Sequence, residues 1–309
     1  MKDIQVAHYR IEPYINRTPV ITSSTFDSLT GGSLFFKCEN LQKVGAFKFR
    51  GATNAVMSLT DKEAANGVAT HSSGNHAQAL ALAARIRGIP ANIVMPRTAP
   101  RVKVEAVRDY GASITFCEPT QKARESTISK VLEETGANFI HPYDDGRIIS
   151  GQATAAVELL NDIADLDIVM TPVGGGGLLS GTSLAVRYIS PKTRMIAAEP
   201  MNADDSFRSF RTGKLIPSDN PDTIADGLLT SLSDLTFSII KENVHDIVTV
   251  SEEGIKRAMK LFWERTKLII EPSAAVPVAA LLEKRILVKD KRVGIILSGG
   301  NVDLDNLPW

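Results

Sequence analysis

The chain has 309 residues, 43% of them apolar, and 35 basic residues balance 35 acidic ones to leave no net charge. That length suffices for two domains or one large α/β unit, and the balanced charge argues against nucleic acid or an anionic membrane as a partner. No run of 18 apolar residues occurs, so no spanning helix is predicted and a cytoplasmic location is expected. The two cysteines, Cys38 and Cys117, are predicted to be reduced, buried thiols.

Short β-branched segments alternate along the chain with longer, alanine-rich amphipathic segments. Strands are predicted at residues 91–96, 112–117, 167–174, 194–200 and 292–300. Helices are predicted at residues 75–88, 101–111, 151–162 and 252–266, several of them ending at a glycine. This alternation predicts an α/β fold with a mostly parallel sheet covered by helices.

A second domain would have to be an insertion, because no repeat, low-complexity tract or flexible linker divides the chain. Two strand and helix alternations lie between residues 67 and 145. We therefore expect a small, mobile domain at residues 67–145 and a large domain made of residues 1–66 and 146–309.

The segment KVGAFKFRGA, residues 43–52, sets one amine, Lys48, between Phe47 and Phe49 in a run that otherwise looks like packing surface. An ammonium in such surroundings requires an explanation, because burial disfavours the charged form of lysine. Lys43 and Arg50 are expected to be the ordinary charges of the segment.

The segment THSSGNHAQAL, residues 70–80, combines hydroxyls, a glycine and an asparagine where a strand pattern gives way to a helix. Such a turn can offer N–H groups and hydroxyls to a carboxylate, although a simple helix cap is the alternative. His71 lies five residues before His76, which is not the spacing of paired metal ligands on a helix. The expected substrate-binding residues are Ser72, Ser73, Gly74, Asn75 and His76.

Four glycines, Gly174, Gly175, Gly176 and Gly177, separate a strand pattern from a helix pattern. Their N–H groups and the following helix N-terminus predict a phosphate cradle, with a close-packed turn as the alternative. A P-loop would require a lysine at Thr182, and the dinucleotide spacing fails at Leu179 and Ser180.

Two further segments follow predicted strands. ILSGGN, residues 296–301, ends a strand with Ser298, where ligands of open parallel sheets gather. AAEPMNADD, residues 197–205, carries Glu199, Asp204 and Asp205, which are oxygen ligands of the kind hard cations prefer. An acidic surface loop is the alternative for the second segment.

Taken in order, GAFKFRGA, SSGNHAQA, VGGGGLLSG and SGGN resemble the motifs of the fold-type II pyridoxal-phosphate enzymes, specifically the serine racemase and serine/threonine dehydratase family. The resemblance covers essentially the whole chain. It implies a tryptophan synthase β-like fold, with a large open twisted sheet domain and a smaller inserted α/β domain. By motif, it implies Lys48 as the Schiff-base lysine, Phe47 against the cofactor ring, Gly174 to Gly177 on the phosphate, Asn75 on the ring hydroxyl and Ser298 on the pyridine nitrogen.

The resemblance also implies that Ser73 is a second acid/base on the face opposite Lys48, as inversion at Cα requires. It implies a magnesium, calcium or manganese site made by Glu199, Asp205 and the carbonyl of Ala203. A homodimer and a nucleotide effector are further expectations from the family.

The expected activity is β-elimination of serine, threonine or a related 3-hydroxy amino acid to a keto acid and ammonia, with serine racemisation as a companion activity. The segment HPYDDG, residues 141–146, looks more like that of dehydratases and microbial racemases than that of animal serine racemases. Three alternatives remain: a threo-3-hydroxyaspartate ammonia-lyase, a cysteine-synthase-type enzyme that performs β-replacement, and a catalytically silent cofactor-binding protein.

Overall fold

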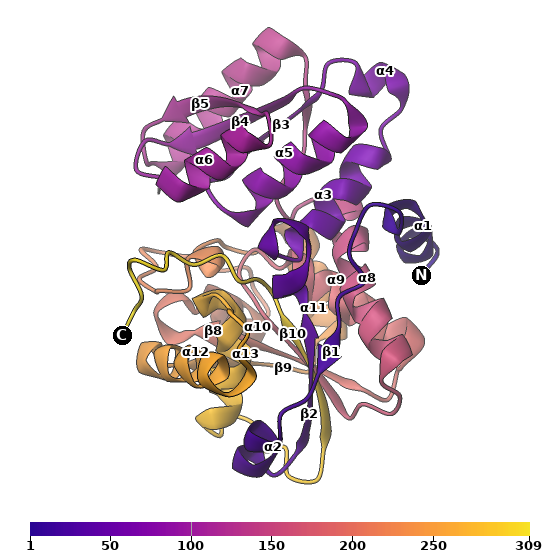
Figure 1. Ribbon diagram of the computed structural model, residues 1–309, viewed down its shortest axis with the longest axis vertical. Coiled ribbons are helices and arrows are strands. Elements are labelled where there is room, and N and C mark those ends of the chain that lie inside the picture. The colour runs from indigo at the N-terminus through magenta and orange to yellow at the C-terminus, as the bar shows by residue number, and fades with distance from the viewer. Residues whose placement is uncertain (100) are drawn as a thin grey trace.

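Two separate β-sheets organise the chain in the computed structural model, which describes residues 1–99 and 101–309 (Figure 1). The large sheet has the order β1 (Val20–Ile21), β2 (Ser33–Cys38), β10 (Arg292–Leu297), β7 (Ile168–Pro172), β8 (Arg194–Pro200) and β9 (Asp246–Val250). The small sheet has the order β5 (Ser113–Cys117), β4 (Ala91–Pro96), β3 (Val68–His71) and β6 (Asn138–Phe139). Every pairing is parallel except that of β1 with β2, so the predicted α/β class is confirmed.

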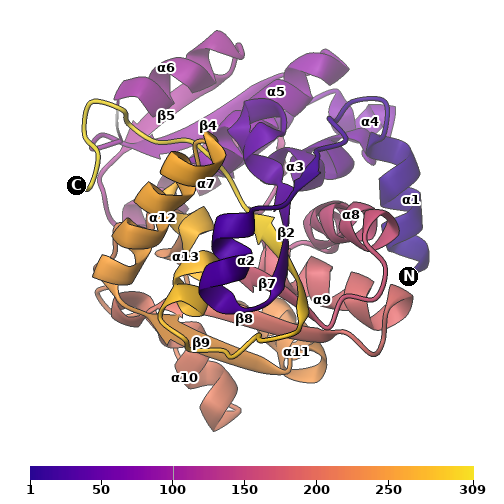
Figure 2. The ribbon, with the colours of Figure 1, turned by 60° about the horizontal axis from the view of Figure 1, so that its bottom comes forward.

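Helices cover both faces of the large sheet, as a parallel sheet with two apolar faces requires. One face packs against α2 (Ser24–Thr30), α12 (Glu252–Thr266) and α13 (Pro272–Leu282). The other packs against α1 (Lys2–Ile11), α8 (Gly146–Asp162), α9 (Gly177–Ile189) and α11 (Asp234–Asn243), with α10 (Asp205–Thr212) at the edge. Figure 2 shows the two groups of helices on opposite sides of the sheet.

The small sheet forms the upper lobe of Figure 1 and has its own apolar core. One face packs against α3 (Lys48–Met57), α4 (Asp61–Ala64), α5 (Asn75–Arg87) and α6 (Arg101–Asp109), and the other against α7 (Gln121–Thr135). Residues 48–64 thus share the core of the small sheet, although α3 also packs on α8 of the large lobe. The domain boundaries at residues 66 and 146 stay a prediction.

The predicted strands and helices agree with the observed ones to within a few residues, except that α8 begins at Gly146, five residues before the predicted start. The strands β1, β2, β6 and β9 were not predicted, and β1 and β6 are only two residues long. Helix α13 was missed too, since it is apolar on all sides and contains Pro277, which obscures the helical period.

Arg50 is fully buried, so the expectation that it is an ordinary charge of its segment is wrong. Its guanidinium donates to Glu39 at 2.7 and 2.8 Å and to Glu158 at 2.7 and 2.9 Å. Lys37 donates to Glu158 at 2.6 Å and to the carbonyl of Thr18 at 2.6 Å. These charges are stable inside the protein because each faces an opposite charge and hydrogen-bonding partners.

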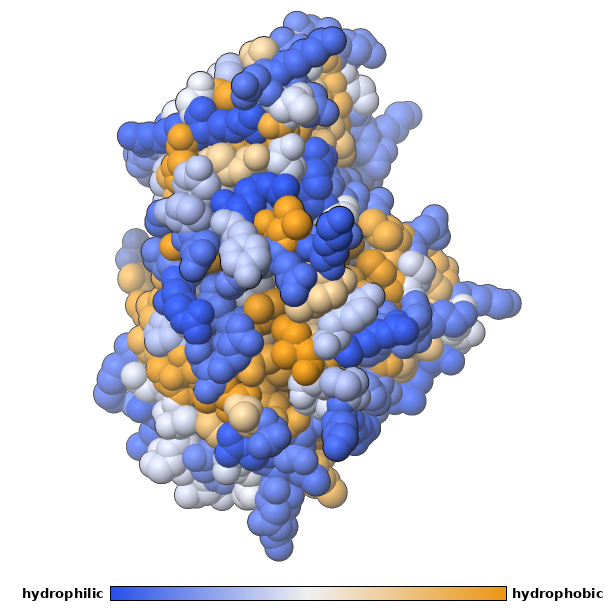
Figure 3. All heavy atoms as spheres, turned by 90° about the vertical axis from the view of Figure 1, so that its right-hand side faces the viewer, coloured by the Kyte–Doolittle hydropathy of each residue, from blue (hydrophilic) through white to orange (hydrophobic). Residues whose placement is uncertain are grey.

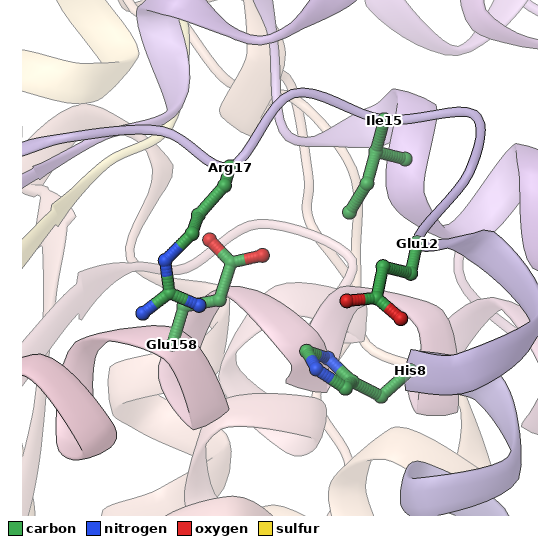
Figure 4. A pocket seen from close by; sticks show the side chains of 5 residues that line it. All are labelled: His8, Glu12, Ile15, Arg17 and Glu158. Atoms are coloured by element: carbon green, nitrogen blue, oxygen red, sulfur yellow. The ribbon is translucent and has the colours of Figure 1, made fainter.

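A small cavity of about 50 Å³ lies beside this network, between α1 and α8 (Figure 4). Glu158 reaches its edge together with Arg17 and with His8 and Glu12 from the first helix and the residues that follow it. Arg17 itself forms an exposed ion pair with Asp162. The cavity is therefore lined by one residue of the exposed pair, Arg17, and by one of the buried network, Glu158.

Arg50→Met should lower the free energy of unfolding by about 3–5 kcal/mol, because it leaves two buried carboxylates, of which only Glu158 keeps a charged partner, Lys37. Urea unfolding followed by circular dichroism measures the change. The matched control is Arg17→Met, whose ion pair is exposed and should contribute less than about 1 kcal/mol. Equal losses in the two variants would contradict the assignment.

Candidate active site

The segment that contains Lys48 is hydrogen-bonded to the segment that follows β10. The N–H of Phe47 donates to the carbonyl of Ser298 at 3.0 Å, and the N–H of Gly300 donates to the carbonyl of Gly45 at 2.9 Å. Both contacts join parts of the chain about 250 residues apart, at the carboxyl end of β10. Ligands of open α/β sheets bind at this end of the strands, so the two motifs meet where a ligand is expected.

Lys48 is the first residue of α3, and its side chain is half-buried. Its Nζ donates to the carbonyl of Pro142 at 2.9 Å and lies 5.3 Å from the ring centroid of Phe47. Burial lowers the pKa of Lys48 to about 8, although the carboxylate of Glu271 acts in the opposite direction. A much larger fraction of neutral amine is therefore present near pH 7 than for an ordinary lysine, as nucleophilic attack on a carbonyl requires.

The four glycines connect β7 to α9, and all of them are buried. Gly176 has φ +85°, a conformation that residues with a side chain rarely adopt. A Cβ at Gly174 would lie 2.9 Å from the Cα of Leu228, so no side chain fits there either. The loop leads into the N-terminus of the 13-residue helix α9, whose free N–H groups and dipole favour an anion.

Ser298 follows β10, is 2% exposed, and its hydroxyl has no hydrogen-bond partner in the described part of the chain. Four other buried hydroxyls of the described residues, those of Thr53, Thr70, Thr171 and Thr182, also have no partner, so it is the position of Ser298 beyond the carboxyl end of β10 that singles it out. The residue therefore fits the predicted role of hydrogen-bonding a ring nitrogen of a bound group.

The turn at residues 72–76 leads from β3 into α5, as predicted. The amide nitrogen of Asn75 donates to the two carboxylate oxygens of Glu271 at 3.0 and 3.1 Å, and its oxygen accepts from Asn301 at 2.8 Å. Ser73 is half-buried in this turn. His76 is buried, and its Nε2 is hydrogen-bonded to the carbonyl of Ile140 at 3.2 Å.

Glu271 is a residue of the site that the sequence analysis missed. It is 4% exposed, accepts hydrogen bonds from Asn75 and from the N–H of Asn301 at 3.2 Å, and precedes α13. Burial and, to a smaller extent, the negative charge of the nearby Asp226 raise the pKa of Glu271 to about 7. A single acid within the apolar run LIIEPSAAVPVAALL is the signal that could have revealed it.

Glu271→Gln should flatten the pH dependence of stability in the cofactor-free protein. The folded carboxyl group keeps its proton to about pH 7, whereas its ordinary pKa is 4.5. The folded state therefore binds more protons than the unfolded chain between these values, and the free energy of unfolding falls as pH rises from 4.5 to 7, by roughly 3 kcal/mol. Glu253→Gln, at an exposed position of α12, should keep this slope. Denaturant unfolding at several pH values measures it, and an unchanged slope in the first variant would refute the assignment.

Glu199, near the end of β8, and Asp205, which begins α10, form a buried pair rather than part of a surface loop. Glu199 is fully buried, accepts from the N–H groups of Ser206 and Phe207 at 3.1 and 2.8 Å, and has a pKa raised to about 8 by burial and by Asp205. Asp205 is 1% exposed, burial raises its pKa to about 6, and neither of its oxygens has a hydrogen-bond partner among the described residues. These two carboxylates and the carbonyl of the buried Ala203 are a donor set suited to a hard cation. Across the described residues, no group of three or more His, Cys, Asp or Glu side chains is arranged to hold a metal ion.

Residues 11–299 match the family described as pyridoxal-phosphate dependent enzyme, and the chain belongs to this family. The glycine loop, the half-buried Lys48 and the unpartnered hydroxyl of Ser298 fit that cofactor. The predicted fold type is confirmed by the matches to solved structures described next.

Several relatives are similar over nearly their whole length. The β-hydroxyaspartate dehydratase of Paracoccus denitrificans is 55% identical, with 100% of this chain and 98% of that protein covered. The serine racemase of Dictyostelium discoideum is 51% identical, and its crystal structure superposes with a TM-score of 0.94 over 98% of each chain. The crystal structure of a threonine deaminase from T.th. is 42% identical, with a TM-score of 0.93 over 98% of this chain and 99% of that one.

Proposed function

We propose that this protein catalyses pyridoxal-phosphate dependent β-elimination of 3-hydroxy amino acids such as L-serine and L-threonine, with racemisation at Cα as a companion activity. The observation that supports this most is the half-buried Lys48, whose amine has a lowered pKa and whose backbone neighbour Phe47 is hydrogen-bonded to Ser298 beyond the carboxyl end of β10. The sequence identities to a dehydratase and to a serine racemase agree with elimination and with racemisation, respectively.

Each predicted site residue would contact a different part of the cofactor. The N–H groups of residues 174–177 would bind the phosphate, Ser298 would hydrogen-bond the ring nitrogen, and Asn75 would contact the ring hydroxyl, with Phe47 against the ring. Lys48 would hold the cofactor covalently until a substrate amine displaces it. When bound, pyridoxal phosphate accepts the electron pair that remains at Cα when its proton departs.

Two bases on opposite faces of Cα would decide the outcome. Lys48, once released, is positioned to remove the Cα proton from one face. Ser73 would donate a proton to the other face, which inverts the configuration, and the same pair working in reverse would accept the D-enantiomer. Loss of the β-hydroxyl instead would yield a keto acid and ammonia. The turn at residues 72–76 would bind the substrate carboxylate.

A second candidate substrate is threo-3-hydroxyaspartate, because a relative with 55% identity is a β-hydroxyaspartate dehydratase. The deciding experiment measures keto acid and chirality with L-serine, D-serine, L-threonine and both 3-hydroxyaspartates, with and without magnesium. Elimination of serine as the dominant reaction supports the first proposal, and a strong preference for hydroxyaspartate supports the second. Conversion of serine only in the presence of an added thiol would indicate β-replacement. Turnover of none of these substrates would indicate a catalytically silent cofactor-binding protein.

We also propose that Glu199, Asp205 and the Ala203 carbonyl bind magnesium or calcium. Either ion, at 100 times its Kd, should stabilise the wild-type protein by about 2.7 kcal/mol and so raise its melting temperature. Asp205→Asn should abolish the shift. Asp204→Asn is the matched control, because Asp204 is already paired with Arg208 at 2.7 Å and should leave the shift intact. An ion-induced shift that survives in Asp205→Asn would overturn the proposal.

The small domain, residues 67–145, is proposed to move against the large one. Lys103 on α6 forms an ion pair with Asp226, which joins the small domain to the large lobe. We expect this ion pair to form only when the two domains are closed on each other. A cavity of about 430 Å³ lies beside this contact and is lined by residues of both lobes, Gln78 and Met259 among them. We propose it as the place of a nucleotide effector. Absence of any ATP or ADP effect on melting temperature or activity would contradict this.

A homodimer and a cytoplasmic location complete the proposal. Apolar side chains gather around the middle of the face that Figure 3 shows, and the exposed apolar residues of the chain include Tyr9 and Tyr188. Light scattering after gel filtration tests the dimer. Across residues 1–99 and 101–309, no helix has the length and apolar character needed to cross a bilayer. Cys38 and Cys117 are both free and buried.

A further inference from the structure

The loop from His141 to Asp145, which we call the strap, joins β6 of the small sheet to α8 of the large lobe. It contacts both ends of the cofactor site. The carbonyl of Pro142 accepts the hydrogen bond from Lys48 Nζ at 2.9 Å, and the next residue, Tyr143, lies on the glycine loop. One short segment therefore spans from the reactive amine to the phosphate cradle.

The ring of Tyr143 explains why the second glycine has no side chain. A Cβ at Gly175 would lie 2.4 Å from both Cδ1 and Cε1 of Tyr143, and the three nearest atoms all belong to this ring. A Cβ at Gly177 would lie 3.0 Å from the Cβ of the same tyrosine. Of the four loop glycines only Gly176 has a positive φ, so it is the ring contact and not a left-handed backbone that excludes a side chain at Gly175.

The strap also contacts this ring through a second aromatic side chain. The imidazole of His141 packs edge-on against Tyr143, with ring centroids 4.6 Å apart at 88°. The Nδ1 atom of His141 accepts from the N–H of Asp144 at 2.8 Å and from that of Tyr143 at 3.3 Å. Asp145 then caps α8 by accepting from the N–H of Arg147 at 2.8 Å. The ring of Tyr143 therefore contacts both an imidazole and the glycine loop.

We propose that Tyr143 is a cofactor-positioning residue, whose ring forms one wall of the phosphate site and keeps the glycine loop in register with Lys48. The contacts that support this come from the ring carbons and not from the hydroxyl, so phenylalanine should replace tyrosine. Removing the ring would leave the loop facing solvent and free to relax, which weakens a preorganised anion site.

The test measures the affinity of the cofactor-free protein for pyridoxal phosphate, by the change in protein fluorescence or in cofactor absorbance. Tyr143→Ala should weaken binding about tenfold or more, and Tyr143→Phe should stay within about twofold of the wild type. Tyr188→Ala is the matched control, because this tyrosine lies exposed on α9, the helix that follows the loop. Wild-type affinity in Tyr143→Ala would overturn the proposal, and so would equal losses in the alanine and phenylalanine variants.

A double-mutant cycle separates this role from a general loss of folding. Gly175→Ala should weaken cofactor binding in the wild-type background, because its Cβ meets the ring, and should have little further effect in the Tyr143→Ala background. Equal losses in both backgrounds would overturn the proposal. Thermal unfolding without cofactor checks the fold, and Tyr143→Leu, expected to bind more weakly than the phenylalanine variant, replaces the alanine variant in the cycle if that variant does not fold. Affinity for the cofactor does not depend on which amino acid is the substrate, so failure here is distinct from failure of the proposed function.

Discussion

Lys48→Ala should abolish the absorbance band of the lysine-linked cofactor and reduce β-elimination by at least about a thousandfold. The half-buried amine meets the three demands of this role: it lies in the site, its pKa is lowered to about 8, and Pro142 orients it. Pyruvate release from L-serine and a spectrum before and after borohydride measure the effect.

The control for this experiment is Lys62→Ala, on the exposed surface of the short helix α4. It should keep the absorbance band and the rate of the wild type. Survival of a borohydride-sensitive band in Lys48→Ala would show that another amine holds the cofactor. Loss of the band in both variants would point to unfolding, which circular dichroism detects.

Ser73→Ala should abolish racemisation of serine while sparing elimination from L-serine. The physical reason is that inversion needs a proton donor on each face of Cα, whereas elimination from one enantiomer needs removal of the proton from a single face. Elimination from D-serine should fall with racemisation, because it begins on the face assigned to Ser73. Chiral chromatography and a keto-acid assay on the same reaction mixtures measure the three rates.

Elimination from L-serine is the internal control for Ser73→Ala, since it reports cofactor binding, substrate binding and the action of Lys48 together. Equal loss of racemisation and of L-serine elimination would refute the two-face assignment. Racemisation at the wild-type rate would assign the second proton donor to another group.

Much of the architecture was predictable from local pattern. The strands β4, β5, β7, β8 and β10 and the helices α5, α6 and α12 each have a periodicity contained within their own residues, and they were predicted to within a few positions. The glycine loop was predicted at the junction of a strand and a helix, because four residues without a Cβ have few other uses there. The family also follows from the order of four short motifs along the chain.

The sequence alone therefore determined the fold class and predicted the roles of Lys48 and of the glycine loop, since each of these depends on neighbouring residues. The tertiary structure decided what these groups contact. Arg50 was misjudged because its carboxylate partners, Glu39 and Glu158, are 11 and 108 positions away. Glu271 meets Asn75 across 196 positions, and Tyr143 meets Gly175 from a different loop. Burial and charge pairing between distant segments arise only when the chain folds, and local periodicity does not contain them.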